Sequence, residues 1–156
     1  MKQIFLYTSL AVMALAATST GLAQPEPCSG TVLLTDMSNF QVRQVDSQTF
    51  VEFDFTGLHE ICLTDGSQVT GTVAGHLGQR TSANGDLTLH FDEVLSYGGG
   101  TLGYHGEASQ TGGNWQSQVM TVGAGSGSLR GIHGQGTFWF TGPTSLADVI
   151  SYVYVP

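Results

Sequence analysis

The chain has 156 residues, 40% of them hydrophobic, and a formal net charge of −8, which is the size and composition of a single domain. Its four basic residues stand against twelve acidic ones. A chain this acidic is repelled by nucleic acid and by anionic membrane surfaces, so we exclude both as partners.

The first 23 residues have the layout of a secretory signal peptide. Lys2 precedes an apolar run over residues 4–17, and small residues lead up to Ala23. A membrane anchor is the alternative, but the apolar run is shorter than the ~20 residues that a spanning helix needs. We therefore expect cleavage after Ala23 and a secreted or periplasmic domain over residues 24–156, with no membrane contact after cleavage.

The two cysteines, Cys28 and Cys62, predict a disulfide, because an even count in an exported chain favours pairing. The alternative is a nucleophilic Cys62 with His59 as its base. Residues three apart on a strand point to opposite faces, so this local pair fails as a catalytic dyad.

Two segments of the chain alternate between apolar and polar residues with the period of a β-strand. These segments are residues 49–57 and residues 85–94. The residues expected to face the interior are Val51, Phe53, Phe55, Leu87, Leu89 and Phe91. The residues expected to face water are Glu52, Asp54, Thr56, Thr88, His90 and Asp92.

Further strands are predicted from their β-branched and aromatic residues. They cover residues 31–35, 40–45, 68–76, 101–109, 115–122, 137–142 and 148–156. Clusters of Gly, Asn and Asp at 64–67, 83–86, 97–100 and 111–114 predict the turns between them. Eight or nine short strands with no helix between them predict an all-β fold, a single antiparallel β-barrel, because closure removes exposed sheet edges. A β-sandwich is the alternative.

A glycine-rich run over residues 123–136 is the most distinctive motif. A phosphate-binding glycine loop opens a helix, whereas the residues that follow this run predict a strand. The sequence also lacks a P-loop lysine, a GxSxG nucleophile motif and the HxH pair of a cupin-type metal site. The run therefore predicts tight turns and close strand contacts rather than chemistry.

Residues 125–134 follow the pattern G-S-G-x-L-x-G-I-x-G, which resembles a late run in the allene-oxide-cyclase-like and dirigent-like barrels. It is also similar to the pattern of small uncharacterised bacterial exported families. The resemblance implies an eight-stranded barrel whose apolar interior holds a hydrophobic ligand, for cyclisation or for stereochemical guidance of phenolic radicals. We expect Leu129 and Ile132 to point inward.

The histidines offer a candidate metal site on the outside of the barrel. His90 with Asp92, and His105 with Glu107, are pairs two residues apart that share one face of a strand. Imidazole and carboxylate together are metal ligands. Solvated histidines beside carboxylates explain the same pattern, and we favour that interpretation. We therefore predict no metal and no cofactor.

The ligand-binding candidates are aromatic residues that could line a barrel mouth, and one arginine that could bind an anion. They are Tyr97, Tyr104, Trp115, Trp139 and Arg130. The inward faces assigned above carry no ionisable group, so the sequence favours a non-enzymatic binder of a small hydrophobic ligand, or a structural module. An isomerase or stereo-directing enzyme acting in the lumen is the alternative. Self-association into a homo-oligomer is left open.

Overall fold

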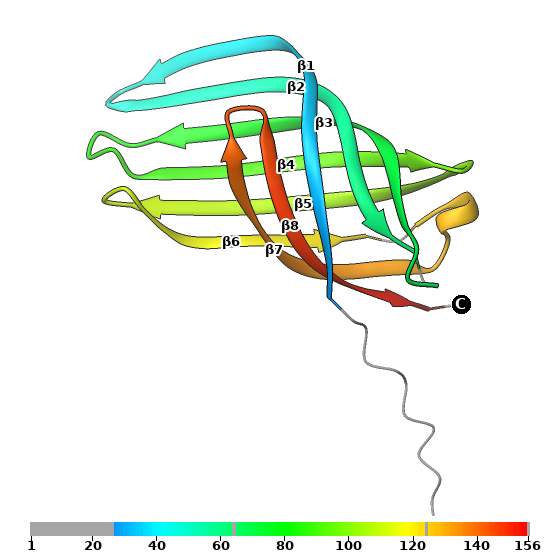
Figure 1. Cartoon of the computed structure of the whole chain (residues 1–156). Helices are drawn as coiled ribbons and strands as arrows, with labels where there is room; N and C mark the ends of the chain where they lie inside the picture. Colours follow the sequence, from blue (N-terminus) through cyan, green and yellow to red (C-terminus); the bar gives the residue numbers. More distant parts are fainter. Residues whose placement is uncertain (1–26, 64, 124, 156) are drawn as a thin grey trace, which may run out of the picture.

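The computed structural model describes residues 27–63, 65–123 and 125–155. Eight antiparallel strands follow one another in chain order around a closed barrel (Figure 1), which confirms the predicted fold class and excludes the sandwich. A single 3₁₀ turn, η1 (Gly127–Leu129), interrupts the meander in the described residues. The strands are β1 (Pro27–Val45), β2 (Gln48–Cys62), β3 (Gln68–Thr81), β4 (Leu87–Tyr97), β5 (Gly100–Thr111), β6 (Asn114–Val122), β7 (Ile132–Gly142) and β8 (Ser145–Tyr154).

The predicted turns lie where the strands reverse. The Gly-Gly pairs at 98–99 and 112–113 both have positive φ angles, which is the backbone that a two-residue hairpin turn requires. One division of the chain was wrong. Residues 31–35 and 40–45 belong to one strand, β1, because residues 36–38 also pair with β2, and two irregularities in the pairing take up residue 35 and residues 39–40.

The barrel has a closed end, where β1 pairs with β8, and a splayed end, where β1 and β2 continue beyond that pairing. Strand β1 pairs with β8 over Pro27–Leu33 and continues beside β2 as far as Val45. Strands β6 and β7 pair over Val119–Val122 and Gly134–Thr137, a short ladder near the closed end. At the splayed end the β7–β8 hairpin stands across the opening in front of the other strands (Figure 1).

The interior is filled by the apolar faces of the strands. Phe55, Leu89 and Phe91 are buried as predicted, and so are Leu129 and Ile132 after the glycine run. Val51 is only half-buried, because it lies on the part of β2 that extends into the splayed end. The predicted outward residues of β4 are exposed.

The disulfide between Cys28 and Cys62 is present and confirms the predicted pairing. It joins the start of β1 to the end of β2, and it leaves no thiol for a nucleophilic Cys62. A disulfide fits an oxidising environment. The predicted signal peptide, residues 1–23, lies outside the described residues. Within the described residues, no helix is long and apolar enough to cross a membrane.

Candidate functional site

Three ionisable side chains meet inside the barrel. His59 comes from β2, Glu93 from β4 and Asp148 from β8, and their exposed fractions are 0%, 3% and 1%. Nδ1 of His59 lies 2.7 Å from Oε1 of Glu93. Nε2 of the same ring lies 2.9 Å from Oδ2 of Asp148. One imidazole therefore bridges two buried carboxylates from opposite sides.

The strand period places these groups inside. Glu93 continues the inward series of β4 after Phe91, and Asp148 lies between two inward apolar residues of β8. The inward series of β4 was predicted to end at Phe91, and the interior was predicted to hold no ionisable group. The second prediction was wrong. Extending the alternation by one step would have found Glu93.

The two carboxylates control the protonation of His59. Burial alone would lower the pKa of the imidazole, because the charged form loses its hydration. The hydrogen bonds that the imidazole donates to Asp148 and Glu93, and the negative charge of these carboxylates, outweigh burial and raise the pKa to about 9. The ring is therefore an imidazolium at neutral pH and donates a hydrogen bond to each carboxylate.

Two tyrosines complete the polar cluster. The hydroxyls of Tyr104 and Tyr152 lie 3.1 Å apart, and the Tyr104 ring packs against the imidazole of His59 at 4.7 Å between centroids. Burial raises the pKa of both phenols, so both remain neutral at physiological pH. The two tyrosines are therefore joined by a hydrogen bond next to the His59 ring.

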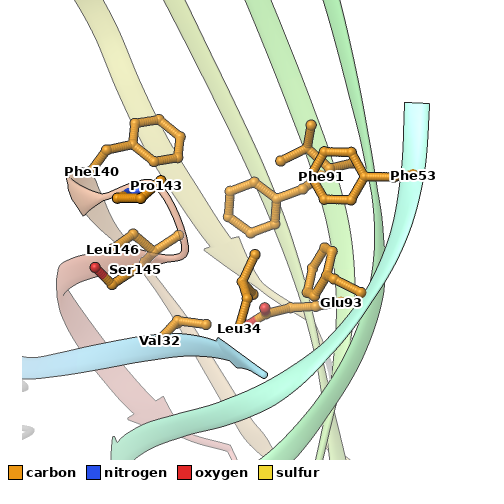
Figure 2. Close-up of a pocket in the computed structure, with 11 residues that line it drawn as sticks. Val32, Leu34, Phe53, Phe91, Glu93, Phe140, Pro143, Ser145 and Leu146 are labelled. Carbon is orange, nitrogen blue, oxygen red and sulfur yellow. The ribbon is translucent and has the colours of Figure 1, made fainter. Parts of the chain in front are cut away.

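A cavity of about 60 Å³ lies beside the network, beneath the β7–β8 turn. Figure 2 shows Phe140, Pro143 and Leu146 on one side, Phe53 and Phe91 on the other, and Glu93 beneath them. Glu93 is the one ionisable residue among the described residues that line the cavity. The lining residues are Val32, Leu34, Phe53, Phe55, Leu77, Phe91, Glu93, Phe140, Pro143, Ser145 and Leu146.

Aromatic residues continue the cavity lining toward the surface. Phe53 stacks on Phe40 of β1, with 4.8 Å between ring centroids. Phe140 lies 5.5 Å from the ring of Trp115. Phe40 and Trp115 are exposed, so a continuous run of aromatic side chains extends from the cavity lining to the surface.

The five predicted ligand-binding residues do not form one site. Tyr104 is buried in the network, and Tyr97 packs against the core. Trp115 reaches the mouth through its contact with Phe140. Trp139 is exposed, and so is Arg130.

The histidine and carboxylate candidates lie together on the outer face of β4 and β5. His105 contacts Asp92 at 2.8 Å and Glu107 at 3.2 Å, and these hydrogen bonds raise the pKa of its imidazole. His90 lies opposite Glu107 in the β4–β5 register. In the part of the chain that the structure describes, no cluster of three or more such residues could hold a metal ion. These exposed contacts contribute little to stability.

The interior site thus combines an apolar cavity with one carboxylate that is held in place by an imidazolium. Such a carboxylate can accept a hydrogen bond from a ligand, or accept a proton from one. Perturbed ionisable groups at a cavity are typical of functional sites. The hollow beside His90, His105 and Glu107 on the outer face is open to solvent, and its ion pairs are exposed, so these groups lack the burial that this chemistry needs.

No protein-family model matches the chain, and no curated protein matches it. Its fold is similar to a crystal structure from Shewanella oneidensis MR-1 of a protein with unknown function from the DUF3224 family, with a TM-score of 0.61. The two sequences are 15% identical, and the match covers 84% of this chain and 99% of the other. At this identity the likeness shows that the two proteins share a β-barrel fold.

Proposed function

We propose that the protein binds a small, largely apolar ligand in the cavity at the splayed end of the barrel. One observation carries the proposal: a cavity lined by Phe53, Phe91 and Phe140 connects to the surface through further aromatic rings. Ligand sites are typically apolar hollows with a few well-placed polar groups. Glu93 supplies the polar group here.

The test is to fill the cavity and measure binding. Hexan-1-ol serves as a neutral apolar probe, followed by isothermal titration calorimetry and by chemical-shift changes. Ser145 lines the cavity and is half-buried, so Ser145→Phe should abolish binding. Ser96 is exposed on the outer face of β4, and Ser96→Phe should leave binding unchanged. Equal binding by both variants would contradict the proposal, as would a failure of the native protein to bind.

An isomerase or stereo-directing enzyme in the lumen is a second candidate, favoured by the buried Glu93–His59–Asp148 network. A carboxylate beside a cavity can move a proton between two positions of a bound molecule. A ligand that co-purifies from the native host would be identified by native mass spectrometry and then incubated with fresh protein in heavy water. Deuterium gained at a carbon of the ligand, and not gained with Glu93→Gln, would favour the enzyme. A carrier would leave the ligand unlabelled.

We also propose that the chain is exported and that the barrel is related to the allene-oxide-cyclase-like and dirigent-like superfamily. The layout of residues 1–23 and the Cys28–Cys62 disulfide support export. The glycine pattern and the eight-stranded barrel support the relationship. The intact mass of the protein from its host tests export, because it should correspond to a chain that starts at Gln24.

A further inference from the structure

The buried network carries one net negative charge. Each of its two hydrogen bonds, one between His59 and Glu93 and one between His59 and Asp148, contains one proton. An imidazolium between two carboxylates gives a net charge of minus one. A neutral imidazole between one carboxylate and one carboxylic acid gives the same total. The charge is therefore independent of where the proton lies along each hydrogen bond.

No side-chain cation of the described barrel compensates this charge. All three arginines are exposed, and Arg43 pairs with Glu52 on the β1–β2 hairpin. Lys2, the one lysine, belongs to the predicted signal peptide. A buried charge without a partner is costly. A ligand that brings a positive charge would remove this cost, whereas a neutral or anionic ligand would not.

The geometry gives the charge one open side, and that side faces the cavity. At the other end of the network, the backbone of Gly30 packs against Asp148, and a Cβ on this glycine would lie 2.8 Å from Oδ1. Tyr104 covers one face of the imidazole. Glu93 lines the cavity, so its carboxylate is the group that an incoming ligand meets.

We propose that the ligand is a small amine, with its ammonium against Glu93 and its apolar part along the aromatic rings of the mouth. This inference rests on the proposed function, because it names the ligand class of the same cavity. The size is consistent, since about 60 Å³ admits an ammonium and a short part of its chain, whereas a cavity known to hold benzene measures ~150 Å³. The remaining chain lies toward Phe53 and Phe140, whose ring faces also attract cations.

The experiment compares three probes of the same length: hexylamine, hexan-1-ol and hexanoate, titrated into the full protein at pH 7 by calorimetry. We expect hexylamine to bind at least tenfold more tightly than hexan-1-ol, and hexanoate to bind more weakly than both. Binding of the alcohol as tightly as the amine would overturn this inference and leave the proposed function intact. Failure of all three probes to bind would overturn the proposed function as well.

Two variants test whether Glu93 causes the preference for hexylamine over hexan-1-ol. Glu93→Gln removes the charge with little change in shape, so it should lose the preference for hexylamine over hexan-1-ol. Glu107→Gln removes an exposed carboxylate from the outer face of β5 and should keep the preference. An unchanged preference in Glu93→Gln would overturn the inference. If that variant fails to fold, the comparison of the three probes on the native protein decides the question alone.

Discussion

Raising the pH through the range in which His59 loses its proton should destabilise the barrel. The ordinary pKa of this side chain is 6.5, and the network raises it to about 9. A raised pKa in the folded state contributes stability that is complete below pH 6.5 and is lost as the pH rises through 9. At about 1.4 kcal/mol per unit, the difference corresponds to about 3 kcal/mol. Because His59 is 0% exposed, solvent screening does not reduce this figure.

The assay is urea unfolding, followed by tryptophan fluorescence between pH 6 and pH 9.5. This range stays below 10, the ordinary pKa of Tyr104 and Tyr152. Asp148→Asn, which leaves His59 one carboxylate, should lose less stability than the native protein over the same range. His105→Gln is the control, because His105 is exposed and should contribute little. A free energy of unfolding that stays constant from pH 6.5 to pH 9.5 would refute the charged state of His59.

Three further predictions concern stability and use the same urea assay at pH 7. Phe53→Asp should cost about 3 kcal/mol, because it puts a charge among the cavity rings, while Asp54→Asn should change stability by less than ~0.5 kcal/mol. Equal effects would mean that the faces of β2 are assigned wrongly. Gly131 and Gly113 share a φ of 82°, but a Cβ on Gly131 would collide with the Val155 carbonyl, whereas a Cβ on Gly113 meets open space. Gly131→Ala should therefore cost more than ~1 kcal/mol and more than Gly113→Ala. Reduction of the disulfide should cost about 3 kcal/mol, and no effect would mean that the bond does not constrain the unfolded chain.

The fold could be predicted from the sequence because it depends on local signals. A period of two assigns the faces of a strand, and Gly-Gly or Asn-Gly pairs mark the reversals between strands. β1 was divided because residues 36–39, Asp-Met-Ser-Asn, resemble a loop. The structure pairs residues 36–38 with β2 and places an irregularity on either side of them, with a positive φ at Asn39. Such irregularities have no clear sequence signature.

The candidate site was missed because it depends on contacts far apart in the sequence. His59 lies 34 residues from Glu93 and 89 residues from Asp148, so only the strand register brings them together. From the sequence, His59 was weighed only as a base for a nucleophilic Cys62. Glu93 and Asp148 could each have been identified as polar residues in inward positions, but their shared partner could not.

The network is better explained by function than by stability. Well-packed apolar residues in place of a buried ionic cluster are often neutral or stabilising, so a barrel core has no need for three ionisable groups. The arrangement here is also directional. Backbone packing encloses the Asp148 end, Tyr104 covers one face of the imidazole, His59 orients the opposite carboxylate, and Glu93 meets the cavity. A cluster that served stability alone would gain nothing from placing a carboxylate at an apolar cavity. A binding site gains affinity from this arrangement, because a carboxylate that is already fixed in place stabilises a ligand that supplies the missing positive charge.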